Sequence, residues 1–127
     1  MVRQIVLIKQ LRKGMIVMKV RELVEKLDLE VIVGKSLDKE ITGGYIGDLL
    51  SNVMAKARAG NLWLTIQGHQ NVVAVALLTE VSAVIIVEDF DIEEEAVKKA
   101  EEKSINILRT PLSAYELAGK LFELGIK

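Results

Sequence analysis

The chain has 127 residues, of which 50% are hydrophobic and 28% are charged, and its formal net charge is −1. This length suits one compact domain with an apolar core, and the near-zero charge disfavours a dedicated nucleic-acid binder. The sequence has no cysteine and one histidine, which excludes disulfides, thiolate zinc sites and histidine-rich metal sites.

The N-terminal region differs from the rest, because residues 1–20 carry basic side chains and no acidic one. Ile5–Ile8 is too short for the apolar segment of a signal peptide, and no apolar run is long enough to cross a membrane. We therefore expect a cytoplasmic protein with no membrane partner. Met15 and Met18 are plausible translation starts, so we expect residues 1–17 to be an extension and residues 18–127 to form the domain. The alternative is that Ile5–Ile8 adds an edge strand.

From Val20 onward, helical and strand patterns alternate along the chain. Expected helices are Val20–Leu27, Tyr45–Ala59, Asn71–Leu78, Ile92–Lys103 and a last helix that Thr110 or Ser113 caps and that runs to about Leu124. Expected strands are Leu29–Val33, Glu40–Thr42, Leu62–Ile66, Val84–Val87 and Ile105–Leu108. Strand–helix alternation with short loops predicts a single α/β domain, three-layer α/β/α, with a mainly parallel sheet of about five strands.

Thr42-Gly43-Gly44 stands between a predicted strand and a predicted helix. Adjacent glycines accept positive φ and allow close approach of another group, and a helix begins with N–H groups that lack partners. A turn of this kind suits a phosphate or carboxylate. The sequence therefore predicts that Thr42, Gly43 and Gly44 bind an anion, and the alternative is that the glycines only form the turn.

Loops that follow parallel strands meet at one edge of a sheet, where ligands tend to bind. The predicted loops there add His69, Asn71 and Arg109, and Arg109 could hold an anion through two parallel hydrogen bonds. With the glycine turn, these residues predict a site for a nucleotide or small phosphorylated effector. The alternative is that His69 and Asn71 cap a helix and that Arg109 pairs with nearby acids.

No residue pattern predicts catalysis. Gly34-Lys35-Ser36 lacks the earlier glycine of a P-loop, since that position is Leu29. His69 has no serine and aspartate at triad spacing that would make it a general base. The acids of Glu88–Asp91 could hold Mg²⁺, but acids are also favoured at the start of a helix, and we expect that simpler role. We predict a non-enzyme with no cofactor and no metal ion.

Three segments resemble the DRTGG domain: I-T-G-G-Y-I-G-D-L-L at 41–50, L-W-L-T-I-Q-G-H-Q-N-V-V-A-V-A at 62–76 and A-Y-E-L-A-G-K-L at 114–121. The resemblance runs from about Met18 to Lys127. Asp38-Lys39 stands where the family has Asp-Arg, which weakens any role that needs a guanidinium. The family is similar to the N-terminal domain of HPr kinase/phosphorylase and occurs in phosphotransacetylases and CBS-containing pyrophosphatases. The resemblance implies an α/β/α fold, frequent self-association and a regulatory role.

Two non-catalytic functions remain open. One is a regulatory or ligand-sensing module, and the other is a homo-oligomeric interaction or adaptor protein without a small ligand. The mean hydropathy of +0.30 and a last helix, Leu112–Leu124, with apolar residues on several faces predict a homodimer or higher homo-oligomer. Trp63 is expected in the core, with an exposed interface position as the alternative.

Overall fold

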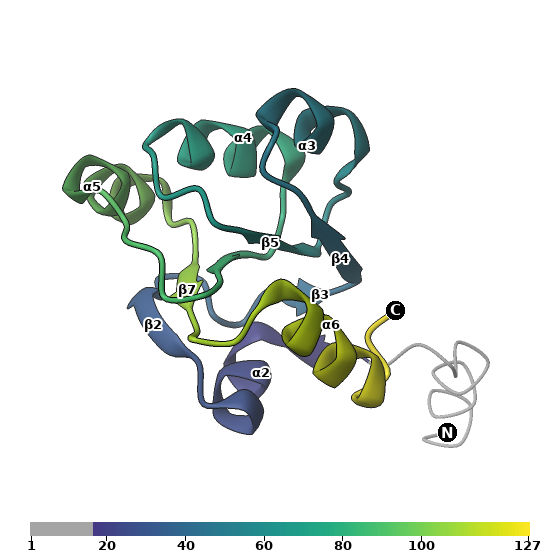
Figure 1. The fold of residues 1–127 in the computed structure, drawn as a ribbon. Helices are drawn as coiled ribbons and strands as arrows, with labels where there is room; N and C mark the ends of the chain where they lie inside the picture. The colour runs from purple at the N-terminus through teal and green to yellow at the C-terminus, as the bar shows by residue number, and fades with distance from the viewer. Residues whose placement is uncertain (1–16) are drawn as a thin grey trace, which may run out of the picture.

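A five-stranded sheet with the order β2-β7-β6-β5-β4 forms the middle layer of the computed structural model, which describes residues 17–127 (Figure 1). Four strands are parallel: β4 (Gly43–Ile46), β5 (Asn61–Thr65), β6 (Ala83–Ile86) and β7 (Ile107–Arg109). The edge strand β2 (Glu30–Val33) runs antiparallel to β7. The predicted fold class, α/β with a mainly parallel sheet of five strands, is confirmed.

Helices cover both faces of this sheet (Figure 1). On one face lie α3 (Leu50–Lys56), α4 (Asn71–Thr79) and α5 (Glu94–Lys103), which connect successive parallel strands. On the other lie α2 (Val20–Leu27) and α6 (Ala114–Glu123). A small antiparallel pair, β1 (Met18–Lys19) with β3 (Glu40–Ile41), precedes β4.

The central strands β5 and β6 are buried along their whole length. Alternate side chains point to opposite faces, so Leu62 and Leu64 join the core beneath α2 and α6, while Trp63 joins the core beneath α3, α4 and α5. Strands covered on both faces are expected to be continuously apolar. The core position predicted for Trp63 is confirmed, and its Nε1 donates a hydrogen bond of 2.8 Å to the carbonyl of Gly47.

Most predicted elements occur near their expected positions. The first helix has the predicted bounds, and the ambiguous apolar run Asn71–Leu78 is the helix α4. Of the two proposed caps for α6, Ser113 is the one that acts: its Oγ accepts from the Glu116 N–H, and the Glu116 carboxylate accepts from the Ser113 N–H. The proposed strand Ile5–Ile8 lies outside the described residues.

The predicted helix Tyr45–Ala59 is wrong over its first third. Gly43–Ile46 is the strand β4, paired in parallel from Gly43↔Asn61 to Ile46↔Leu64, and α3 begins only at Leu50. The apolar spacing of this segment fits a helix locally, but pairing with the buried strand β5 outweighs that preference. The predicted glycine turn is therefore also wrong. Within residues 17–127, the glycines with positive φ are Gly60 (85°) and Gly125 (88°), and neither Gly43 nor Gly44 has one.

Candidate ligand site at the carboxyl edge of the sheet

The loops that follow β4 and β5 are joined through Asp48. Its carboxylate accepts hydrogen bonds from Thr65 Oγ1 at 2.7 Å and from the Ile66 N–H at 3.0 Å. The side-chain amide of Gln67 donates to the Asp48 carbonyl at 2.8 Å. Asp48 thus fixes the geometry of two neighbouring loops at the edge where a parallel sheet offers space to a ligand.

His69 and Asn71 lie at the start of α4, immediately after β5. The Nδ1 atom of His69 accepts from the Asn71 N–H at 3.1 Å, while His69 Nε2 is 3.9 Å from Glu93 Oε1. Nδ1 is the acceptor in this contact, and Nε2 is the ring nitrogen that faces Glu93. This contact is the capping alternative for His69, while Asn71 supplies only its main-chain N–H, and the imidazole is 46% exposed.

Arg109, the last residue of β7, is held by acids from two other segments. Its Nε donates to Glu30 Oε1 at 2.9 Å, and Nη1 is 3.9 Å from Asp91 Oδ1. The hydrogen bond and charge of Glu30 raise the pKa of Arg109, and Asp89 and Asp91 add to this effect. Pairing with local acids, the alternative interpretation of Arg109, is therefore observed.

The loop after β6 is hydrogen-bonded to the segment that follows β7. Glu88 and Asp89 both have positive φ, 57° and 54°. Their N–H groups donate to the carbonyls of Leu112 and Thr110, at 2.9 and 3.0 Å. These bonds attach the loop after β6 to residues 110–113, the segment that connects β7 with α6 on the other face of the sheet. No group of three or more potential metal ligands occurs within residues 17–127.

Thr42, Gly43 and Gly44 lie at the opposite end of the strands from His69, Asn71 and Arg109. Thr42 precedes β4, where its hydroxyl donates to the Ala59 carbonyl at 2.8 Å and accepts from the Asn61 side chain at 3.3 Å. The structure therefore does not bring the six predicted residues together. The prediction placed the glycines after a strand, whereas they begin one.

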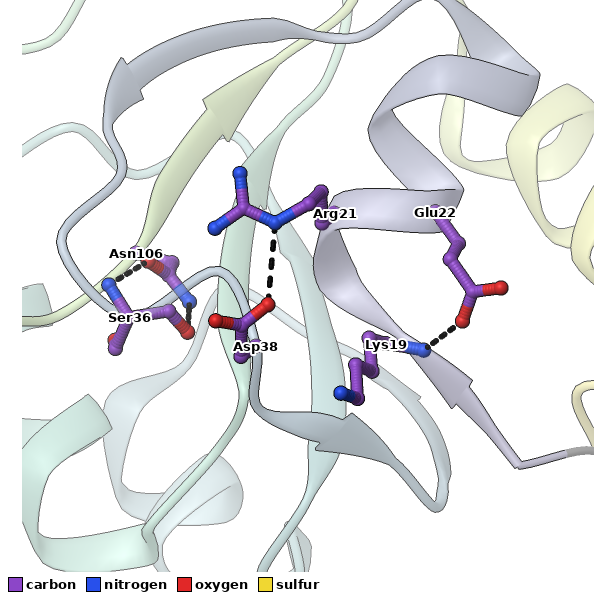
Figure 2. A network of polar contacts seen from close by, with 6 residues as sticks. All are labelled: Lys19, Arg21, Glu22, Ser36, Asp38 and Asn106. Atoms are coloured by element: carbon purple, nitrogen blue, oxygen red, sulfur yellow. Dashed lines mark hydrogen bonds and ion pairs between the residues drawn. The ribbon is translucent and has the colours of Figure 1, made fainter.

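The same amino-terminal end of the sheet contains the polar network of Figure 2. Asp38, at the position of the family's Asp-Arg pair, accepts from Arg21 Nε of α2 at 3.1 Å. Arg21 lowers the pKa of Asp38, first through this hydrogen bond and then through its charge. In this chain, therefore, the guanidinium that pairs with Asp38 comes from position 21.

Charge at the carboxyl edge limits the ligands that it can accept directly. Glu30 and Asp91 pair with Arg109, Asp89 also acts on its charge, and Glu93 lies 3.9 Å from His69. Like charges repel a bare phosphate at such a surface. An anionic ligand would therefore need a bridging divalent cation, or would need to replace the carboxylates on Arg109. A sequence pattern could not reveal Asp48, because its partners, Thr65 and Ile66, become neighbours only through the sheet.

The sheet order and the helix positions define a small three-layer α/β domain. The chain matches the DRTGG domain over residues 22–124, most of its length, and belongs to that family. No curated protein matches it. None of the helices in residues 17–127 has the length and apolar character needed to cross a membrane.

Among solved structures, the chain is similar to the CBS and DRTGG domains of the regulatory region of Clostridium perfringens pyrophosphatase, complexed with the activator diadenosine tetraphosphate. The TM-score is 0.67 and the sequence identity is 14%. The match covers 85% of this chain and 47% of the pyrophosphatase chain, so this chain corresponds to about half of that region. The similarity establishes the shared fold.

Proposed function

We propose that this protein is a non-catalytic regulatory module that senses a nucleotide or a small phosphorylated effector. Membership in the DRTGG family is the observation that supports this function. The similar pyrophosphatase region is regulatory and binds a nucleotide activator, which supports the same class of ligand here. The loops at the carboxyl edge lie outside the strand pairing, so a ligand can bind there without breaking the sheet.

We place the ligand at the carboxyl edge, with His69, Asn71 and Arg109 as its contacts. Thr42, Gly43 and Gly44 would belong to a separate site at the other end of the strands. The half-exposed ring of His69 can stack on or hydrogen-bond to a base, and Arg109 can exchange Glu30 or Asp91 for a phosphate. This exchange gives up at least one ion pair, so binding should be modest, salt-sensitive and stronger with Mg²⁺.

Isothermal titration calorimetry with diadenosine tetraphosphate, ATP and AMP, with and without Mg²⁺, tests this function. We expect Arg109→Gln to weaken binding at least about tenfold, because a charge-assisted hydrogen bond is lost. Arg21→Gln is the matched control, since it removes a paired, exposed arginine at the other end of the sheet. Weakening by Gly44→Val instead of Arg109→Gln would move the site to the glycines. No heat with any of these compounds would refute a nucleotide ligand.

A homo-oligomeric adaptor without a small ligand is the second candidate. Large apolar side chains are exposed on helices of both faces, including Leu78 (69%) on α4 and Phe122 (60%) on α6. We propose that the protein self-associates under either function. Light scattering at micromolar concentration that returns the monomer mass of 14.1 kDa would contradict self-association. Calorimetry would still decide on the ligand.

A further inference from the structure

The helix α4 has an unusual composition for the outer layer of a domain. Its sequence, N-V-V-A-V-A-L-L-T, contains no charged residue. Val72, Val73, Val75 and Ala76 are buried against the sheet, as expected. On the outer side, however, Leu77 and Leu78 are 46% and 69% exposed. Ala74 and Asn71 are exposed on the same side, one and two turns before these leucines. A helix that is apolar all around is normally buried on all sides.

The surroundings of α4 have the layout of an interface. Next to it, α3 and the residue before it expose Met54 and Leu49, at 51% and 62%. On the other flank, a groove of about 260 Å³ runs between α4 and α5, where Lys99, Glu102 and Lys103 line its outer side. Protein interfaces commonly have such an apolar centre, depleted of charge, within a charged rim.

We propose that the outer face of α4 binds a second copy of this chain, with the two α4 helices antiparallel. This assignment rests on the self-association proposed above and names its surface. Ala74 lies at the middle of the exposed side, where a small residue lets two helices approach closely. Antiparallel packing places Leu77 of each chain beside Gln70 and Ala74 of the other, which form the amino-terminal part of the groove.

Charge and size favour a second copy as the occupant. Because α4 itself has no charge, the centre of the contact desolvates no ion, while Lys99, Glu102 and Lys103 of α5 lie at its rim. A stable dimer buries about 800 Å² on each partner, roughly a tenth of the chain's 7498 Å² of accessible surface. The outer side of α3, α4 and α5 covers one whole face of the sheet (Figure 1) and can supply this area.

The exposed side of α6 is the competing surface. Tyr115 and Phe122 are exposed there, but Glu116, Lys120 and Glu123 alternate with them. Such a face is already amphipathic and is compatible with water. The α4 face lies on the opposite side of the sheet from α6.

Single-cysteine cross-linking separates the two surfaces, because the chain has no cysteine of its own. In packed helices with axes about 8–10 Å apart, facing Cα atoms come within disulfide range. Ala74→Cys should therefore form a covalent dimer rapidly under mild oxidation. Gly119→Cys on α6 is the control, since an added Cβ there meets no atom within 4 Å.

A second pair of variants tests the energetics of the same surface. Leu78→Glu should raise the dimer dissociation constant at least tenfold in light scattering, whereas Tyr115→Glu, on the 90% exposed residue of α6, should not change it. Circular dichroism establishes that both variants fold. A dimer that is cross-linked by Gly119→Cys but not by Ala74→Cys would overturn the surface while self-association stands. A monomer at all concentrations would overturn both.

Discussion

Asn106, at the start of β7, and Ser36, in the loop after β2, are joined by two reciprocal hydrogen bonds across 70 positions of sequence (Figure 2). Asn106 Oδ1 accepts from the Ser36 N–H at 3.1 Å, and Nδ2 donates to the Ser36 carbonyl at 2.8 Å. Nδ2 also donates to the carbonyl of Ser82 at 2.9 Å. One buried amide thus attaches the first part of the chain to both β6 and β7.

Replacing this amide should destabilise the domain strongly. Asn106 is 1% exposed, and Asn106→Ala removes its three hydrogen bonds to the main chain of Ser36 and Ser82, so we expect a loss of about 2–4 kcal/mol in the free energy of unfolding. Urea denaturation measures this loss. The control, Ser36→Ala, removes only the hydroxyl bond to the Ser104 carbonyl and should cost less than about 1 kcal/mol. Equal losses would show that the amide is not the essential group.

Asp48 gives a prediction about the loops at the carboxyl edge. Asp48→Ala removes the acceptor of both Thr65 Oγ1 and the Ile66 N–H, and we expect a loss of about 1–3 kcal/mol. Asp48→Asn keeps an oxygen at this position and should lose less than half of that amount. Hydrogen exchange of the Ile66 amide should accelerate in Asp48→Ala. An Ile66 amide that stays equally protected would disprove the bridging role.

Gly60 and Gly44 can be compared directly, because Gly60 has a positive φ and Gly44 does not. At Gly60, φ is 85°, and an added Cβ would lie 2.5 Å from Thr42 Cγ2, so Gly60→Ala should cost about 1–3 kcal/mol. At Gly44, the nearest atom to an added Cβ is the Leu62 carbonyl oxygen at 3.4 Å. Gly44→Ala should therefore change stability by less than about 0.5 kcal/mol. The reverse ranking in thermal denaturation would favour the glycine turn at positions 42–44.

The α6 cap predicts a dependence on pH. The hydrogen bond from the Ser113 main chain is the first cause that lowers the pKa of Glu116 below its usual 4.5. Because the pKa is lower in the folded state, the carboxylate stabilises α6 above pH 4.5 and loses this effect as the pH falls through the folded value. Glu116→Gln cannot titrate. Its stability deficit relative to the natural sequence should be present at pH 6 and shrink as the pH falls below 4.5, and a deficit that does not change with pH would contradict this linkage.

Sequence patterns predicted the elements whose stability is local or whose environment is uniform. The buried strand β6 and the capped helix α6 are examples, since a β-branched run and a Ser-x-x-Glu box each contain their own signal. The strand β4 has no such signal. Gly43 and Gly44 disfavour a strand, and only pairing with Asn61 and Leu62 makes them one.

The candidate site depended on the same pairing. A turn after a strand would place Gly43 and Gly44 near His69. In the structure they begin β4, the strand that pairs with β5, and so lie at the opposite end of the sheet from His69. The approach of Glu30 to Arg109 likewise needs the antiparallel register of β2 with β7. Residue types and spacing placed His69 and Arg109 at the carboxyl ends of parallel strands, as observed. Their partners, Glu93 and Glu30, depend on contacts over long sequence separations.

The order of the strands has a consequence for how the domain assembles. From β4 to β7, each parallel strand pairs with the next one in the chain, whereas β2 pairs with β7 about 75 residues later. Contacts between near segments close smaller loops, so the β4–β7 unit should form first and the β2 edge should dock last. Pulse-labelling hydrogen exchange should therefore protect the amides of β5 and β6 before those of β2, and the Ser36–Asn106 bonds would mark the final step of folding.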